Sequence, residues 1–211
     1  MGIAPNRESS VGGHTLCVMP LPRTNDAQID ILLNGARGPN VRSTCTLVRD
    51  HGLTIVIDPG MAPSQRAILD PLGACGVEPG EVTDVIISHH HPDHTINVGL
   101  FGDARVHDHW ATYHHDTWDS HPAEGYEVSP SVRLWETPGH TPQDITTFIG
   151  TKDGLIACTH LWWDHDGPAV DPFAVDPLAL RRGRLRVLAV EPALVIPGHG
   201  SPFRPDESTP R

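Results

Sequence analysis

The sequence predicts an α/β fold built on mixed β-sheet. Short apolar runs of strand length recur along the 211 residues, and two longer stretches, residues 63–72 and 176–190, carry apolar residues at helical spacing. Strands come first, helices then alternate with strands, and a last strand precedes the C-terminal segment. This order is typical of sheets covered by helices. We expect a single domain over residues 14–211, preceded by a polar tail of residues 1–13.

Four apolar runs open the predicted domain, over residues 14–21, 29–33, 43–49 and 53–58. The last two flank Asp50-His51-Gly52, a short hairpin signal. The link of residues 35–42 has two glycines and a proline, and we expect it to border the active-site cleft. In the helix of residues 63–72, Ile68 and Leu72 share one side, which should therefore face the core.

Four more strands are predicted in the second half, over residues 132–136, 144–149, 155–158 and 194–196. The helix of residues 176–190 separates the last two of these strands. Its apolar positions recur at helical spacing, and its arginines are predicted to form a solvated face: Arg181, Arg182, Arg184 and Arg186.

The most informative stretch is residues 88–94, Ser-His-His-His-Pro-Asp-His, which follows the apolar run of residues 82–87. Side chains two apart in an extended segment share a face. His89 and His91 are therefore expected to point the same way, while His90 points away. Ligand-type side chains are thus gathered at the end of a predicted strand.

Pro92 breaks this strand, and a helix is expected over residues 95–100, with Asp93 and His94 at its start. Imidazoles beside a carboxylate suit a borderline divalent cation such as Zn²⁺. The alternative is a histidine-rich surface loop, because 15 histidines in the chain make chance clusters more frequent. We interpret the corner as a metal site.

Two further histidines follow apolar runs at turns of the same kind. His140 lies in Thr-Pro-Gly-His-Thr and His199 lies in Pro-Gly-His-Gly. In this order with His-x-His-x-Asp-His, these motifs resemble those of the metallo-β-lactamase fold superfamily, over about residues 44–203. Sequences flanking the motifs are similar to a subgroup that is associated with RNA cleavage.

The resemblance implies a metallo-β-lactamase-like αββα sandwich, in which two mixed β-sheets lie face to face with helices on the outer faces. It also implies a ligand set in two parts: His89, His91 and His140 for one metal, and Asp93, His94 and His199 for a second. Zinc is expected, with iron or manganese as alternatives, as one or two ions. Asp58 ends a predicted strand, and it is either a turn former or, as the resemblance implies, a carboxylate that orients a metal-bound histidine.

One position departs from the pattern. Family members with two metals usually place a bridging Asp where this chain has His160. A carboxylate bridges two cations, whereas a neutral imidazole offers one lone pair to one metal. Three outcomes are open: His160 binds one ion, Asp164 or Asp166 takes the place of the missing carboxylate, or only one site fills. We expect His160 to contact metal.

Residues 104–121 alternate aromatic with ionisable side chains. A second metal cluster is conceivable there, but the spacing fits no familiar ligand set. We expect a lid or pocket wall instead. The tryptophans expected to line the substrate pocket are Trp110, Trp118, Trp162 and Trp163.

Composition limits the partners. Acidic residues outnumber basic ones 26 to 15, for a net charge of −11, which disfavours a nucleic-acid partner without excluding it. No run has the length of a signal-peptide core or a membrane span, so we expect a cytoplasmic protein without a membrane partner. The expected buried free thiols are Cys17, Cys45, Cys75 and Cys158. The oligomeric state is left open.

The function that these expectations favour is metal-dependent hydrolysis of a small ester, lactone, thioester or amide by a metal-bound hydroxide. Asp93 is expected to orient the nucleophile and to pass a proton to the leaving group, which makes it the catalytic residue. Three alternatives are kept. They are a metal-dependent nuclease acting on RNA, a mononuclear iron dioxygenase of the persulfide dioxygenase type, and a non-catalytic metal-binding protein.

Overall fold

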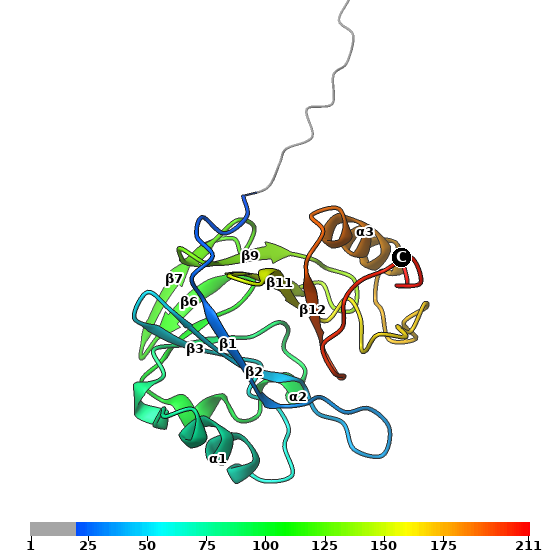
Figure 1. The fold of residues 1–211 in the computed structure, drawn as a ribbon. Helices are drawn as coiled ribbons and strands as arrows, with labels where there is room; N and C mark the ends of the chain where they lie inside the picture. Colours follow the sequence, from blue (N-terminus) through cyan, green and yellow to red (C-terminus); the bar gives the residue numbers. More distant parts are fainter. Residues whose placement is uncertain (1–19) are drawn as a thin grey trace, which may run out of the picture.

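Two β-sheets form the centre of the protein in a computed structural model that describes residues 20–211 (Figure 1). The predicted tail of residues 1–13 and most of the predicted strand at residues 14–21 lie outside the described residues. The first sheet contains, in spatial order, β1 (Gln28–Leu33), β2 (Cys45–Asp50), β3 (Leu53–Ile57), β4 (Asp84–Ile86), β5 (Arg105–His107), β6 (Ala111–His114) and β7 (Thr117–Ser120).

The second sheet has the order β12 (Leu194–Pro197), β11 (Gly154–Thr159), β10 (Ile145–Thr151), β9 (Val132–Glu136) and β8 (Glu127–Ser129). Both sheets are mixed. In the first, β4 runs parallel to β3 and β5, and in the second β11 runs parallel to β12. The other neighbouring strands are antiparallel, including the predicted β2–β3 hairpin.

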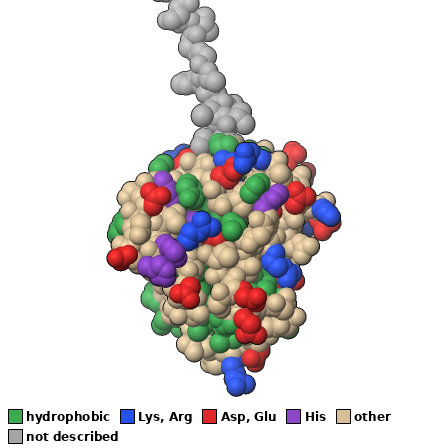
Figure 2. Space-filling model, turned by 90° about the vertical axis from the view of Figure 1, so that its left-hand side faces the viewer, with side chains coloured by type: hydrophobic (Ala, Val, Ile, Leu, Met, Phe, Trp, Pro, Cys, Tyr) green, Lys and Arg blue, Asp and Glu red, His purple; other side chains and the backbone are tan. Residues whose placement is uncertain are grey.

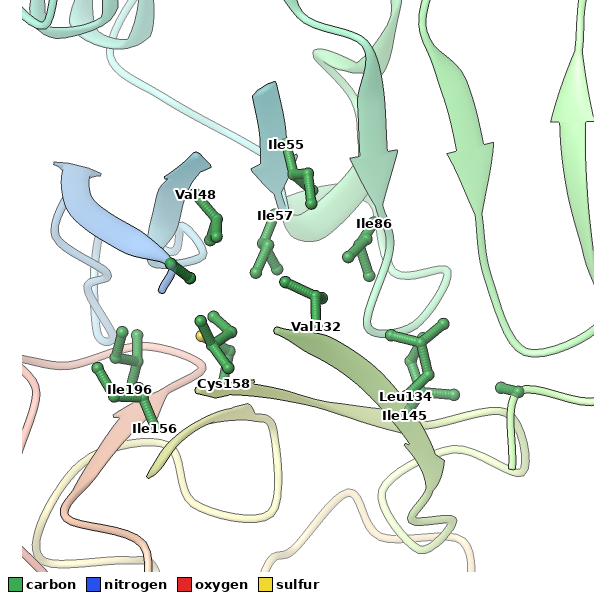
Figure 3. Close-up of a cluster of buried hydrophobic side chains, with 13 residues drawn as sticks. Val48, Ile55, Ile57, Ile86, Val132, Leu134, Ile145, Ile156, Cys158 and Ile196 are labelled. Carbon is green, nitrogen blue, oxygen red and sulfur yellow. The ribbon is translucent and has the colours of Figure 1, made fainter. Parts of the chain in front are cut away.

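The space between the sheets is filled by aliphatic side chains (Figure 3). Ile55 and Ile57 of β3 face the second sheet, while Val56 between them faces the opposite side. On the facing strand β11, Ile156 and Cys158 point inward in the same way. Successive side chains of a strand point to opposite faces, so these continuous apolar runs place apolar side chains on both faces of each sheet.

Helices cover the two outer faces (Figure 1). Ile68 and Leu72 of α1 (Arg66–Ala74) pack against the first sheet, as their spacing predicts. Leu180 and Val187 of α3 (Pro177–Leu188) pack against the second. The predicted αββα sandwich is confirmed.

Two predicted helix boundaries are wrong. α1 begins at Arg66 instead of residue 63, and a helical turn follows the histidine corner earlier than predicted, as α2 (Pro92–Thr95). Pro92 occupies the first turn of α2, where a missing N–H costs no hydrogen bond. Asp93 and His94 therefore lie within this helix, which sets the directions of both side chains.

The predicted solvated arginine face of α3 is also only partly correct. The side chain of Arg184 is buried and donates to three carbonyl oxygens of the loop after β11, those of Leu161, Pro168 and Ala169. A buried guanidinium is tolerated here because each of these bonds satisfies one of its donors. The arginine fixes the path of the loop that leaves β11.

Candidate metal centre

The histidine corner connects β4 to α2. His89 and His94 are buried, while His91 is exposed at the edge of a pocket. His90 points away as predicted, and its Nε2 lies 3.0 Å from Oδ2 of Asp108. The corner thus directs His89 and His91 to one side.

Three histidines from the second sheet meet this corner. His140 follows β9, His160 follows β11 and His199 follows β12. Together with the corner residues they form three overlapping groups, in each of which one ligand atom per residue lies within 4.8 Å of the others. These groups are His89, His91 and His140, then His89, His94 and His160, then Asp93, His94 and His199. The predicted convergence of the distant motifs is therefore present.

The first group is more closely spaced than the Asp93 group. Nδ1 of His91 lies 3.0 Å from Nε2 of His89 and 3.1 Å from Nε2 of His140. In the Asp93 group, Oδ2 of Asp93 lies 3.5 Å from Nε2 of His94 and 3.6 Å from Nε2 of His199. Such spacings are short enough for one cation to lie between the atoms of each group.

His160 lies between the first and the Asp93 groups. Its ring centroid is 4.2 Å from that of His140 and 5.0 Å from that of His199, and its Nε2 is 3.0 Å from Nε2 of His199. A side chain at Gly198 would place its Cβ 2.4 Å from Cδ2 of His160, so the glycine before His199 makes room for the ring. Asp164 and Asp166 belong to none of the three groups.

Three of the six histidine rings are fixed through their outward nitrogen. Nδ1 of His94 lies 2.8 Å from Oδ2 of Asp58, Nδ1 of His140 lies 2.7 Å from Oδ2 of Asp171, and Nδ1 of His199 donates to the carbonyl oxygen of Arg42 at 2.9 Å. When Nδ1 carries the hydrogen, the lone pair is on Nε2, which faces the cluster. The role that the sequence suggested for Asp58 has the geometry it requires.

Asp58 is itself held in an uncommon conformation. Its φ is 51°, in the left-handed region that Asp adopts more readily than most residues. Its Oδ1 accepts a hydrogen bond from the backbone N–H of Ser88 at 2.7 Å. The carboxylate is thus clamped to the backbone on one side and to His94 on the other.

Sequence reasoning missed two carboxylates. Asp171 is buried in the loop before α3 and contacts His140 from 31 residues away. Asp144 accepts hydrogen bonds from both the N–H and the hydroxyl of Thr141, and its Oδ1 lies 3.9 Å from Nδ1 of His89. No local sequence pattern indicates the role of Asp171. Asp144 could have been found from the sequence, because it lies four residues after His140 and closes the turn that carries this histidine.

The pKa shifts favour free lone pairs on His89 and His160. Burial lowers the pKa of His89 and His160 well below the usual range, and the neighbouring histidines lower both further. Burial also lowers the pKa of His94, but the Asp58 carboxylate more than offsets this and the net pKa is raised. Burial raises the pKa of Asp144 to about 6. His89 and His160 are therefore neutral at pH 7, the form that binds metal.

The residues present fit a divalent cation. Nε2 of His94 and Nδ1 of His160 are buried without a hydrogen-bond partner among the described residues. A buried polar atom without a partner costs free energy, which a coordinated cation would recover. Imidazole nitrogens with a single carboxylate are ligands suited to zinc and to iron.

A cavity of about 800 Å³ opens onto the cluster. Its floor includes His91, Asp93, His140 and His199, and apolar side chains line its walls, among them Val41, Trp163, Phe173 and Val175. Residues of the 35–42 link border it, as predicted. Arg37 also lines the cavity and forms an ion pair with Asp164, with Nε 2.5 Å from Oδ2.

Of the four tryptophans predicted to line this pocket, the structure brings only Trp163 to it. Trp162, in the loop that follows β11, is fully buried in the cluster between the second sheet and α3. Trp110 and Trp118 are exposed on the β5–β6–β7 extension of the first sheet. The predicted lid is therefore wrong, since residues 104–121 continue a sheet.

Charge is mixed on the face of the molecule that carries β6 and β7. In Figure 2, acidic, basic and histidine side chains are interspersed over this face, without a continuous basic surface. Within the described part of the chain, no helix is both long and apolar enough to cross a membrane. Cys45 and Cys158 are buried free thiols as expected, Cys75 is only partly buried, and Cys17 lies outside the described residues.

Comparison with known proteins places this geometry in a family. Residues 38–134 match the family model of the Metallo-beta-lactamase superfamily. Metallo-beta-lactamase domain-containing protein 1 of Xenopus laevis is 32% identical over 160 residues, which cover 72% of this chain and 68% of the relative. The Homo sapiens protein of the same name is 35% identical over 161 residues, covering 71% of this chain and 59% of the relative. The chain thus spans about three fifths of the human relative's length.

Solved structures share the fold at lower identity. The hydrolase AbOPH of the beta lactamase superfamily superposes with a TM-score of 0.64 at 18% identity, covering 89% of this chain and 93% of the other. A quorum-quenching N-acyl homoserine lactone lactonase superposes with a TM-score of 0.59 at 22% identity, covering 85% and 90%. These similarities show a common fold.

Proposed function

Because this chain belongs to the metallo-β-lactamase superfamily, we propose that its histidine centre binds one or two divalent metal ions, zinc first among them, and hydrolyses a small ester, lactone, thioester or amide. One observation carries the proposal. Ligand atoms from four loops converge at the floor of a cavity whose walls are largely apolar. A cavity of this kind, with a few convergent polar groups, is typical of a small-molecule site.

The proposed ligands are those predicted from the sequence. His89, His91 and His140 hold one ion, and Asp93, His94 and His199 hold a second, with His160 as a ligand from the position between them. A bound zinc ion lowers the pKa of a coordinated water molecule to about 7 and polarises a carbonyl oxygen.

Buried carboxylates support binding of cations despite the missing bridging Asp. Asp58 and Asp171 contact the outer nitrogens of His94 and His140, and Asp144 lies near that of His89. Negative charge just outside the ligands attracts cations and raises the basicity of the rings. His160 therefore does not leave Asp93 as the only negative charge near the centre.

Asp93 is the proposed catalytic residue. Its carboxylate lies at the cavity floor, close to Nε2 of His94 and of His199. From this position it takes a proton from the attacking water and passes it to the leaving group. Its backbone carbonyl accepts hydrogen bonds from the N–H groups of Ser43 and Met61, which keep the first turn of α2 in place.

The cavity walls favour a compact substrate that is largely apolar. Val41, Phe173 and Val175 line the cavity and are exposed in the absence of a ligand, so a substrate that covers them gains apolar burial. Arg37 is the one Lys or Arg among the described lining residues, and Asp164 already neutralises it. A polyanion such as RNA finds little positive charge here.

Metal content and hydrolysis test the proposal together. Protein purified without added metal is analysed for zinc, iron and manganese, then assayed on p-nitrophenyl esters, γ-lactones, thioesters and single-stranded RNA. We expect zinc and turnover of at least one small substrate. Stoichiometric iron, or metal-dependent cleavage of RNA alone, would contradict the proposal in favour of the dioxygenase or the nuclease. Metal binding without any turnover would favour a non-catalytic protein.

Asp93→Asn tests the role of the carboxylate. We expect a rate about 10²- to 10⁴-fold lower, the range that a general acid–base group supplies. The control is Asp119→Asn, which changes an exposed carboxylate on β7. Metal content is measured on both variants, since a rate loss with metal retained separates proton transfer from metal binding. Full turnover by Asp93→Asn would remove the proposed mechanism.

A further inference from the structure

The loop between β11 and α3 contributes the aromatic wall of the cavity. Trp163 and Phe173 stack with ring centroids 5.7 Å apart and an interplanar angle of 17°. Both line the cavity beside His140 and His199. Phe173 is 68% exposed, so burial alone does little to hold its ring in place.

That support is the carboxylate of Asp171. Its Oδ1 accepts the backbone N–H of Phe173 at 2.8 Å, and its Oδ2 accepts Nε1–H of Trp163 at 3.2 Å. The same Oδ2 lies 2.7 Å from Nδ1 of His140. One buried carboxylate therefore contacts a proposed metal ligand and both members of the wall.

Backbone contacts reinforce the connection. The N–H of Val175 donates to the carbonyl oxygen of His140 at 3.3 Å, and the N–H of His199 donates to that of Trp163 at 2.7 Å. The aromatic wall is thus bonded to His199 directly, and its neighbour Val175 is bonded to His140. A displacement of the wall would have to move at least one of these ligands or break a buried hydrogen bond.

We propose that Asp171 is a positioning residue that couples metal binding to recognition of the apolar part of the substrate. It orients the ring of His140 toward the ion and at the same time fixes the Trp163–Phe173 wall against which the substrate packs. This role rests on the proposed metal site and hydrolase function. It assigns selection of the substrate to the side of the cavity that Trp163 and Phe173 form.

The chemistry of an amide explains why Asp171→Asn is the informative change. Three N–H donors point at the two oxygens of Asp171. An amide has one acceptor oxygen and one NH₂ group, so at least one of the donors faces another donor in either orientation. The substitution keeps size and shape while breaking the shared support.

Two measurements that need no turnover test the coupling. Zn²⁺ affinity is measured by chelator competition on metal-stripped protein. Binding of the linear carboxylates from acetate to octanoate is then measured by calorimetry on zinc-loaded protein. In the wild type, affinity is expected to rise about fourfold for each methylene group buried against the wall. For Asp171→Asn we expect Zn²⁺ affinity to fall about 10- to 100-fold, together with a smaller gain per methylene group.

Matched variants separate the two effects. Phe173→Ala should lower the gain per methylene group and leave Zn²⁺ affinity unchanged. Asp166→Asn, in the same loop but exposed and bonded only to its neighbours, should change neither. Trp163→Phe removes one donor to Asp171 and keeps a ring, so it should lower both quantities by a few-fold, and it serves if Asp171→Asn fails to fold.

The outcomes distinguish this inference from the proposed function. A wild type that binds no Zn²⁺ would end the proposed function itself. A wild type that binds Zn²⁺ normally, with Asp171→Asn or folded Trp163→Phe unchanged in either quantity, would overturn the coupling alone.

Discussion

Two stretches of this chain are rich in histidine, and the fold uses them differently. The corner at residues 89–94 meets His140, His160 and His199, and their ring nitrogens face one another. The segment of residues 107–121 contains five histidines, yet none of them belongs to a group of potential ligands among the described residues.

The difference lies in how the ring nitrogens are engaged. In the segment of residues 107–121, both nitrogens of His107 have partners, Thr112 and Asp84, and both nitrogens of His121 do as well. In the metal centre, His94, His140 and His199 each bond one outward partner and turn the other nitrogen toward the cluster. Among the described residues, the buried Nδ1 of His109 also has no hydrogen-bond partner, yet His109 belongs to no group of potential ligands. A metal site therefore depends on free nitrogens that converge on one point more than on the number of histidines.

Replacing one buried histidine in each region is the strongest test of this comparison. His89→Ala removes a ring that belongs to two of the three groups, and we expect Zn²⁺ affinity to fall at least about 100-fold. His107→Ala removes a ring that is equally buried, and it should keep wild-type Zn²⁺ affinity while losing stability. Chelator competition and urea denaturation measure the two quantities. Equal losses of affinity would show that the comparison is mistaken.

The outward partners provide the next test. Asp58→Asn weakens the contact that orients His94, so Zn²⁺ affinity should fall about 10- to 100-fold. Asp84→Asn makes the same chemical change beside His107 and should leave Zn²⁺ affinity as it is. The comparison between regions fails if both variants bind Zn²⁺ alike.

His160 tests how the centre balances charge. His160→Asp places a carboxylate between the first and the Asp93 groups, and we expect the second ion to bind about tenfold more tightly, a change of about 1.4 kcal/mol. Zn²⁺ titration with metal counting by mass spectrometry measures the effect. An unchanged second affinity would indicate that Asp58, Asp144 and Asp171 already supply the charge needed.

Asp84 gives a pH-dependent effect outside the metal centre. Burial raises the pKa of Asp84, but hydrogen bonds from His107, Arg105 and Thr83 outweigh it, so the net pKa is lowered. A lowered pKa means that this group stabilises the fold above the unfolded value of about 3.9 and stops doing so as the pH falls through the folded value. Asp84→Asn should therefore cost about 1–3 kcal/mol at pH 7 and less at pH 3. Urea denaturation at the two pH values measures this, and an equal cost at both would contradict it.

The smallest effect is expected at the tip of the β6–β7 hairpin. His114 and His115 are exposed there, with ring centroids 4.1 Å apart. His114→Ala should change stability by less than about 0.5 kcal/mol and leave Zn²⁺ affinity unchanged. A measurable loss of Zn²⁺ binding would show a second Zn²⁺ site at this hairpin, contrary to the difference between the two regions.

Much of the fold follows from local pattern. The apolar run of residues 53–58 placed β3 within one residue of its observed end, and the hairpin signal at residues 50–52 placed the turn correctly. The helix boundaries near Pro63 and Pro92 were less accurate, because a proline is compatible with both the first turn of a helix and the loop before it.

The sequence by itself determined the family and the residues that meet at the candidate centre, because strand endings and the spacing of His89, His91, Asp93 and His94 are local properties. Only the tertiary structure decided that Asp171 contacts His140, that Trp163 alone of the four tryptophans reaches the cavity, and that Arg184 is buried. These depend on the path of the loop after β11, which contacts with distant elements fix. A short stretch of sequence does not predict contacts between residues that are far apart along the chain.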